Sequence, residues 1–538
     1  MILPLFDSWP ILPIAAYAET HFRFRFIPSL LFKREPEVIA DTPHRVEPGN
    51  ALPILILIKD ADRYPIVLRS ITASLRGEGI ANDTQLHSGS LLVREKLWWN
   101  VFDLPVDGCN GWISVNVDIT FERGGRLRRF QNDNLRTSSR SPLRVFVANS
   151  QLPGLPNLAW GEAHAHSQYT SDQVEFGSPL SAARHLATSL GLKFFCATDH
   201  SYDLDDSMDD YLKQDPELTK WKQFQSEIDS LNSNTNDFVI VRGEEVSCRN
   251  AEGRNIHLLL YGTRKFFYGS GDGAENGLNN RSEHTAEEVF EALEESTSAF
   301  AAHAMEPVPF VQRLLLNRGT WQQTNLDQLR LSGIQFANGR RDVGFDRGYQ
   351  VWIAMLLKGR KVFTIAGNDA HGNFNRFRQV QIPHVALRES HDQLFGKMRT
   401  GLFTSRLTEE NLLSGFARGS MIISDGPAGN IVFVHETEPT SMGKTYSRSA
   451  YSVRLLAIST REFGSLKSVT LFRGIIGEHR ETELLTESLF DHPFHREKIF
   501  EISPSANCYI RFEIHTHNDS ADSQSHFCFS NPVWLLGN

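Results

Sequence analysis

The chain has 538 residues, of which 40% are hydrophobic and 22% charged, and its formal net charge is −9. This composition is typical of an ordinary globular protein with several domains, and it excludes a large basic surface for nucleic acid. No uncharged apolar run reaches the roughly 18 residues of a membrane span. The apolar N-terminus lacks a basic leader and is interrupted by Asp7, Pro10 and Pro13, which argues against a signal peptide. Five scattered cysteines favour reduced thiols and a cytoplasmic location.

Strands dominate the first segment. In GWISVNVDITFERGG, polar and apolar residues alternate, as in a half-buried strand. One face of this strand carries only apolar residues, namely Ile113, Val115, Val117, Ile119 and Phe121. Gly124-Gly125 then predicts a hairpin turn. Apolar runs at 52–60 and 142–149 predict further strands, so we expect a β-sandwich-like domain over residues 1–152.

The second segment, residues 157–405, alternates between strand and helix patterns. A loop at 149–157 with two prolines and a glycine separates it from the first. A predicted strand at 157–166 precedes a helix whose apolar face carries Leu180, Ala183, Ala187 and Leu190. Apolar runs predict buried strands at 192–200, 237–245, 255–262, 298–303, 333–339 and 361–371. Their length and spacing favour a largely parallel sheet.

Strand alternation returns in the last segment. Ile510, Phe512 and Ile514 line one face of CYIRFEIHTHN, and we predict a second β-sandwich-like domain over residues 415–538. His515 and His517 lie in the same strand with one residue between them. No other ligand motif is near them, so we interpret them as surface histidines.

Histidines and carboxylates stand at or near the ends of the strands predicted in the middle segment. They occur in GEAHAHSQYTSD, CATDH, RGEE, AHAMEP and GNDAH, while His257 lies early in its strand. Because side chains alternate along a strand, His164 and His166 project from the same face. An isolated pair of this kind is more often exposed and unliganded. Six such motifs in one segment instead predict a metal site, and imidazoles with carboxylates suit Mn²⁺, Fe²⁺ or Zn²⁺.

In their order, these motifs resemble those of the PHP (polymerase and histidinol phosphatase) metallohydrolase family. The family's HxH motif, followed by an acid or histidine six residues on, matches His164, His166 and Asp172. Its TDH motif matches Asp199 and His200, its GxE motif matches Glu245, and its lone strand histidine matches His257. Its HP-type motif matches His303, and its closing SDAH motif matches Asp369 and His371. In the fifth motif the proline is displaced to Pro307, and in the last Asn368 replaces the serine. The stretches MRTGLFTS, SDGP and FSNPVWL are similar to the carbaryl-hydrolase-like (CehA/McbA) branch.

The resemblance implies an α/β fold, a distorted (β/α)7 barrel flanked by the two β-sandwich domains. It also implies two or three divalent ions (Mn, Zn or Fe) in three positions. By resemblance, the first would be held by His164, His166, Glu245 and Asp369, the second by Glu245, His257 and His303, and the third by Asp172, His200 and His371. Glu245 would bridge two ions, while Glu244, on the opposite strand face, would be structural. Asp199 would orient a ligand histidine.

A centre of this kind supplies hydroxide from bound water, which predicts a hydrolase acting on a small molecule. The preferred substrate is a small phosphate ester, with Arg376 and Arg378 clamping the phosphate and Glu245, Asp369 and Asp199 also in catalytic roles. Ion pairs within their own loop are the open alternative for the two arginines. Two other functions stay open: hydrolysis of a carbamate, ester or amide, and metal-stabilised binding without catalysis. The sequence predicts neither a nucleic-acid nor a membrane partner, and leaves the oligomeric state undetermined.

Overall fold

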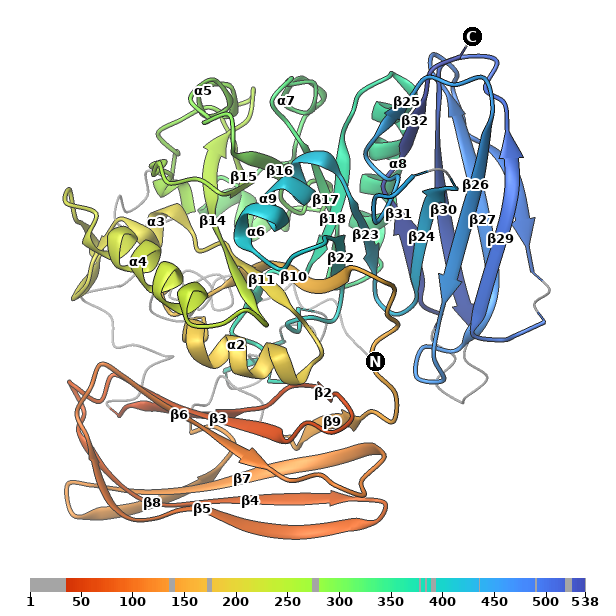
Figure 1. Cartoon of the computed structure of the whole chain (residues 1–538). Coiled ribbons are helices and arrows are strands. Elements are labelled where there is room, and N and C mark those ends of the chain that lie inside the picture. Colours follow the sequence, from red (N-terminus) through yellow and green to blue (C-terminus); the bar gives the residue numbers. More distant parts are fainter. Residues whose placement is uncertain are drawn as a thin grey trace.

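The computed structural model describes residues 35–134, 141–171, 177–272, 280–376, 379–382, 385–388, 393–434, 436–488, 491–517 and 525–537. Figure 1 shows three regions that follow the chain: N-terminal strands at the bottom, a middle segment with most of the helices above them, and C-terminal strands at the right. Among the described residues, no helix combines the length and the apolar character needed to cross a membrane.

The N-terminal region consists of two sheets packed around an apolar core. One is antiparallel and contains β1 (Glu37–Asp41), β3 (Leu52–Lys59) and β6 (Leu97–Leu104). The other has the order β2-β9-β7-β4-β5, with β8 on β7; these are β2 (Arg45–Val46), β9 (Leu143–Val147), β7 (Gly111–Arg123), β4 (Ile66–Gly77), β5 (Ile80–Val93) and β8 (Arg126–Gln131). The alternation predicted for β7 is confirmed, since its five apolar residues are at most 2% exposed. The Gly124-Gly125 hairpin is confirmed too, and both glycines have the positive φ that such a turn requires.

The middle strands form one mixed sheet that carries the predicted ligands. Its order is β18-β17-β16-β15-β14-β11-β10-β22-β23, with β19 on β10. The strands are β10 (Leu158–His166), β11 (Phe194–Ala197), β14 (Val239–Arg249), β15 (Asn255–Tyr261), β16 (Ser298–Ala301), β17 (Gly333–Asn338), β18 (Phe363–Gly367), β19 (Ala370–His371), β22 (Arg399–Phe403) and β23 (Met421–Ser424). β10, β11 and β14 are parallel, as are β16, β17 and β18, whereas β15 is antiparallel to both its neighbours.

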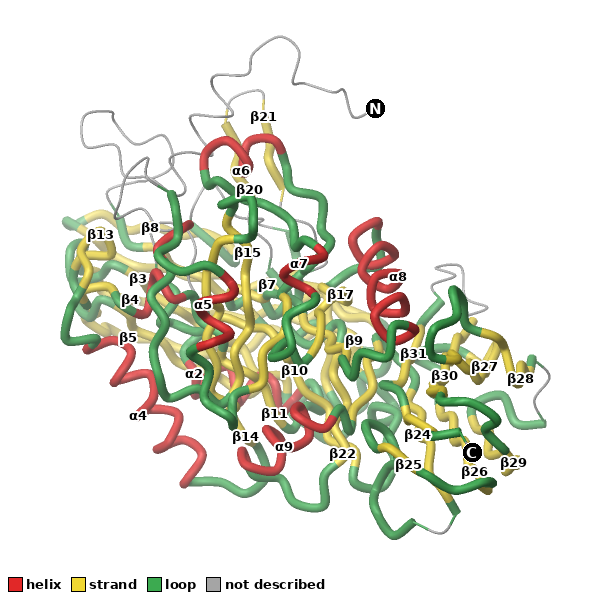
Figure 2. Tube along the Cα trace, turned by 90° about the horizontal axis from the view of Figure 1, so that it is seen from above, coloured by secondary structure: helices red, strands yellow, loops and turns green. Residues whose placement is uncertain are grey.

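The described part of the middle segment contains longer and shorter helices. The longer ones are α2 (Leu180–Ser189), α4 (Thr219–Ser233), α8 (Val343–Leu357) and α9 (Glu409–Arg418). The shorter ones are α3 (Ser201–Leu204), α5 (Ala286–Glu291), α6 (Phe310–Leu315) and α7 (Gln323–Leu326). The apolar face predicted for α2 is buried, and the helix lies between β11 of the middle sheet and β3 of the N-terminal sheets (Figure 1). In both views α8 lies between the middle strands and the C-terminal strands (Figures 1 and 2).

The predicted α/β fold, a distorted (β/α)7 barrel between two β-sandwich domains, is wrong. Strands make up 44% of the structure and helices only 16%, and the described strands belong to several large sheets. A barrel of that kind needs a helical crossover between successive parallel strands. Here a short turn at 250–254 joins β14 to β15 as an antiparallel pair, with Gly253 at φ 74°. The error has a physical cause: a strand buried on both faces is apolar whether its neighbours run parallel or antiparallel.

The C-terminal strands extend the same sheet beyond β23. They follow as β31 (Phe527–Ser530), β30 (Cys508–His517), β27 (Ser465–Ile475) and β28 (Thr482–Glu487), with β32 (Val533–Leu535) on β30 and β25 (Thr445–Tyr446) on β32. A separate antiparallel sheet contains β24 (Ala428–Phe433), β26 (Tyr451–Ile458) and β29 (His495–Ile502). Two small hairpins, β12 (Asp206–Ser207) with β13 (Asp210–Gln214) and β20 (Gln379–Ile382) with β21 (Val385–Arg388), lie outside these sheets.

The predicted apolar face of β30 is buried, and so is most of its other face. Ile510, Phe512 and Ile514 are fully buried, as is the guanidinium-bearing side chain of Arg511 between them. Arg511 donates to Glu513 Oε1 at 2.6 Å and to the hydroxyl of Tyr349 on α8, also at 2.6 Å. This buried charge therefore ties the C-terminal strands to a helix of the middle segment.

Candidate metal centre

Eight of the nine predicted ligands converge in one place; the ninth, Asp172, lies outside the described residues. Each of the eight stands on or directly after a strand of the middle sheet, and they come from six different parts of the chain: His164 and His166 (β10), His200 (after β11), Glu245 (β14), His257 (β15), His303 (after β16), and Asp369 and His371 (after β18 and in β19). The sheet thus collects residues that are more than two hundred positions apart in the sequence, for example His166 and Asp369, whose Nε2 and Oδ1 atoms lie 3.1 Å apart.

Glu245 is the centre of this cluster. It is 1% exposed, and its two carboxylate oxygens face five imidazoles. The distances to Oε1 are 2.7 Å from His257 Nδ1 and 3.2 Å from His303 Nε2, and those to Oε2 are 2.9 Å from His200 Nδ1, 3.4 Å from His164 Nε2 and 3.5 Å from His166 Nε2. A carboxylate in this position can be shared between neighbouring cations.

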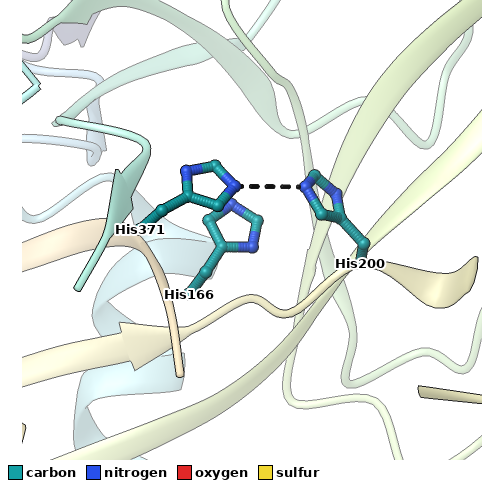
Figure 3. A group of neighbouring side chains, drawn as sticks. All are labelled: His166, His200 and His371. Atoms are coloured by element: carbon teal, nitrogen blue, oxygen red, sulfur yellow. Dashed lines mark hydrogen bonds between the residues drawn. The ribbon is translucent and has the colours of Figure 1, made fainter. Parts of the chain in front are cut away.

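Three groups of these side chains have ligand atoms within 4.8 Å of one another. The groups are His164, His166, Glu245 and Asp369; His200, Glu245 and His257; and His166, His200 and His371. The first is the set predicted for the first metal position. In the second group, His200 lies beside Glu245 and His257, and His303 Nε2 lies 3.2 Å from the same carboxylate. In the third, His166 joins His200 and His371, as Figure 3 shows.

The donor atoms of the cluster fit a bound cation. His164 Nε2, His200 Nδ1 and Glu245 Oε2 are buried and, within the described structure, make no hydrogen bond of acceptable geometry although they face one another. His371 Nε2 and His200 Nε2 likewise point at each other, 3.4 Å apart (Figure 3). Buried polar groups without partners are costly. Lone pairs directed at a common point are what a divalent cation satisfies, so the residues could hold one or more ions.

Electrostatics in the cluster keep the carboxylates ionised. Burial alone would lower the pKa of His164, but the carboxylates of Glu245 and Asp369 outweigh it and raise the pKa to about 10. Burial would raise the pKa of Glu245, yet the facing imidazoles hold it well below its usual range. His166 behaves oppositely to His164: burial and the neighbouring His371 and His200 lower its pKa well below the usual value. Without a cation, a proton therefore stays on His164.

Two of the predicted ligands have strained backbones. His303 has φ 30° and Asp369 has φ 52°, a region that residues with a Cβ seldom adopt. Such strain persists only where the surroundings enforce it, and it gathers at functional sites. Here each residue directly follows a buried strand and is turned toward Glu245 or toward His166.

Asp199 does not contact a ligand histidine directly among its described hydrogen bonds. Its carboxylate accepts from the backbone N–H groups of Ser167 and Thr170, both at 2.8 Å, and from the Ser167 hydroxyl. The Thr170 hydroxyl lies 3.2 Å from His166 Nδ1. Asp199 thus shapes the turn after β10 and acts on His166 through Thr170, one step further away than the sequence suggested.

Glu244 and Glu245 have the separate environments that strand alternation predicts. Glu244 is fully buried and points away from the cluster, where its Oε1 accepts from Ser201 Oγ at 2.8 Å and from the backbone N–H of Phe267 at 3.2 Å. Burial raises the pKa of Glu244 well above its usual value. Burial therefore favours the neutral form of this structural carboxyl, in contrast to its neighbour.

Two positioning residues were missed from the sequence, Gln335 and Glu162. Gln335 on β17 is fully buried; its Oε1 lies 2.9 Å from His164 Nδ1 and accepts from the backbone N–H of His303. Glu162 on β10 accepts from the backbone N–H groups of His164 and Asn368, both at 2.9 Å, and from the Asn368 amide. Each fixes two ligand-bearing segments relative to one another. Their signal was a polar residue inside an apolar strand, in GIQFAN and LAWGEAHAH.

The predicted phosphate clamp finds no support in the described contacts. Arg376 is buried, and its Nε lies 3.9 Å from Asp41 Oδ2 at the end of β1, while Asp41 also accepts from the backbone N–H groups of Phe374, Asn375 and Arg376. This is an ion pair that docks the loop on the N-terminal sheets, close to the alternative left open by the sequence. Arg378 lies outside the described residues.

The histidines of β30 stay apart from this centre. His515 Nε2 lies 3.4 Å from Glu513 Oε2 and its side chain is 25% exposed. Within the described residues, neither His515 nor His517 belongs to a group that could hold a metal ion.

No protein-family model matches the chain, and no curated protein matches it in sequence. Among solved structures it is compared with a β-glucuronidase from Parabacteroides merdae with glycerol in its active site, at 7% identity and a TM-score of 0.18, covering 94% of this chain and 64% of that chain. Another is a cycloisomaltooligosaccharide glucanotransferase from Paenibacillus sp. complexed with cycloisomaltoheptaose, at 9% identity and a TM-score of 0.18, covering 92% and 71%. The chain thus spans 64% of the length of the first. TM-scores this low carry no argument about fold or function.

Proposed function

We propose that the chain is a metal-dependent hydrolase with a di- or trinuclear centre, similar in its ligand motifs to the PHP metallohydrolases. The observation that carries the proposal is the placement of Glu245, whose two oxygens face five imidazoles from four different segments at 2.7–3.5 Å. A buried carboxylate surrounded in this way has no evident structural purpose, because its own strand is already anchored by backbone pairing to β11 and β15.

The residues of the cluster would differ in role according to their position. Glu245 would be shared between ions, with His164, His166 and Asp369 on one side and His200 and His257 on another. Bound divalent ions would lower the pKa of water toward neutrality and stabilise negative charge on the attacked centre. Gln335, by accepting from His164 Nδ1–H, fixes the tautomer that leaves Nε2 directed at the cluster.

A small phosphate ester is our first choice of substrate, because multinuclear centres stabilise both the attacking and the leaving oxygens of an in-line displacement. A neutral carbamate, ester or amide is the second choice. One observation favours it: Arg376, the predicted phosphate clamp, is paired with Asp41 instead.

A loading and turnover experiment tests the proposal. The purified protein, stripped with a chelator and reloaded with Mn²⁺ or Zn²⁺, should retain two or three equivalents after gel filtration and should release phosphate from a panel of small phosphate esters. Turnover of p-nitrophenyl acetate or aryl carbamates without phosphate release would select the second substrate class. Two or three retained ions with no turnover of either class would indicate metal-stabilised binding, and less than one retained equivalent would refute the metal centre itself.

A further inference from the structure

A cavity of about 220 Å³ opens beside the cluster, on the side of His257 and His303. Both histidines line it, together with Glu306, Arg318, Trp321 and Arg340. Pockets for drug-sized ligands measure about 300–1,000 Å³, so this one suits a smaller molecule. Any ligand in it would lie directly against two of the proposed metal ligands.

Arg318 places a cation at the inner end of this cavity. Its Nη1 lies 3.4 Å from His257 Nδ1, the same nitrogen that lies 2.7 Å from Glu245 Oε1. The backbone around Arg318 is held firmly, since the N–H of Gly319 donates to the Asn255 carbonyl at 2.8 Å and β15 begins at that asparagine. A group bound by this guanidinium would therefore also face the cluster.

The remaining wall of the cavity combines paired polar groups with one apolar side. Arg340 also lines it, but its Nε lies 2.7 Å from Asp342 Oδ2, and Glu306 accepts from Asn338 Nδ2 at 2.9 Å. Trp321 is 5% exposed, and its Nε1–H donates to the His257 carbonyl at 3.2 Å, which fixes the indole as a rigid wall. The Arg318 guanidinium beside the cluster is therefore the group of this wall that favours an anionic ligand.

We propose that Arg318 binds the phosphoryl group of a small phosphate monoester in this cavity, with the leaving alcohol lying toward Trp321. The inference rests on the proposed hydrolase function, with a phosphate ester as substrate, and adds the residue that binds it. Hydrolysis breaks the ester P–O bond and forms a P–O bond to the oxygen of water, and one proton of that water ends on the leaving alcohol. The guanidinium holds phosphoryl oxygens by charge-assisted hydrogen bonds while this exchange takes place.

The test measures binding of inorganic phosphate to the metal-loaded protein by isothermal titration calorimetry. Arg318→Ala should raise the Kd for phosphate more than tenfold, while elemental analysis finds the same metal content as in the wild type. Arg318→Lys should recover part of the affinity, because an ammonium supplies charge without the two-pronged contact. In turnover assays, KM for the phosphate ester should rise. Arg347→Ala, on an exposed arginine of α8 outside the cavity, is the matched control.

The outcomes separate this inference from the function it rests on. Wild-type protein that holds metal but binds no phosphate would refute the phosphoesterase proposal itself. Phosphate binding that is equal in wild type and Arg318→Ala would overturn the role of Arg318 and leave the hydrolase standing. Loss of metal from both Arg318 variants would show that the arginine supports the ligand shell instead, and would also overturn the inference. Should the alanine variant fail to fold, Arg318→Gln, which keeps the side chain long and polar, carries the same comparison.

Discussion

Replacing Glu245 by glutamine should abolish metal binding at the shared position, and the same change at Glu244 should not. Glu245 has five imidazole nitrogens within 3.5 Å of its oxygens, so its charge acts at contact distance on any ion held there. Two unit charges about 4 Å apart interact by about 4 kcal/mol at an effective dielectric constant of about 20. If structural relaxation and water compensate for half of this energy, the binding free energy falls by about 2 kcal/mol per unit of cation charge. A divalent ion should then bind at least about a hundredfold more weakly.

Glu244→Gln is the matched control because burial favours the neutral form of the neighbouring carboxyl. Burial raises the pKa of Glu244 well above its usual value, and its Oε1 accepts from Ser201 Oγ and from the Phe267 N–H. Glutamine keeps the shape and that acceptor, so the cost should stay near the 1 kcal/mol of one ordinary hydrogen bond, about fivefold or less in any equilibrium.

The assay is competition with a fluorescent chelator, which gives the Kd of Mn²⁺ or Zn²⁺ for each variant, followed by turnover of the phosphate-ester panel. Circular dichroism of each variant controls for folding. Equal losses in the two variants, or a Glu245→Gln protein that keeps its full metal content and activity, would refute the assignment of Glu245 as the shared ligand.

Three further predictions concern other buried charges. Arg511→Met should lower the free energy of unfolding by about 3–5 kcal/mol, because Glu513 is left buried without its cation; urea unfolding measures this, and a loss under 1 kcal/mol would contradict it. Burial would raise the pKa of Glu513, but Arg511 outweighs it and lowers the pKa from 4.5 to about 2. The ionised form is therefore the stabilising one, so the stability advantage of wild type over Glu513→Gln should be complete above pH 4.5 and shrink as the pH falls toward 2; an advantage that grows in acid would show the sign to be wrong. Arg376→Ala should lower the thermal midpoint while leaving kcat/KM for a phosphate ester within about twofold, because its partner is Asp41; a tenfold fall in kcat/KM with normal metal content would restore the clamp hypothesis.

Local patterns in the sequence predicted individual strands well. The alternation in Ile113–Phe121 gave a half-buried strand, and the run at 157–166 gave β10, with His164 and His166 on one side of it. These features depend on side-chain periodicity, which is a local property. The closing of seven parallel units into a barrel depends on strand direction, and β15 shows why that part was wrong. An apolar heptapeptide such as NIHLLLY is equally compatible with either direction.

The sequence also predicted which residues converge, but not how these residues divide into groups. His200 lies closer to Glu245 than the predicted partition allowed, because an isolated parallel bridge outside the regular strand pairing joins these two residues. Irregularities of this kind leave no trace in residue spacing. Gln335 was missed for a related reason. A single polar residue in an apolar strand does not indicate a role at the site until the histidine that faces its amide is known.

The uninterrupted sheet from β18 to β28 limits how this chain can be divided or recombined. β23 lies between β22 and β31, with Ile422 opposite Ser530 and Ser424 opposite Cys528. A fragment ending after α9 would lose β23 and leave the outer edge of β22 unpaired beside the predicted ligands of β10, and an exposed edge of this kind recruits other chains. Protein engineering therefore faces a restriction: the half that carries the predicted ligands can exchange its C-terminal strands only for strands that restore this register.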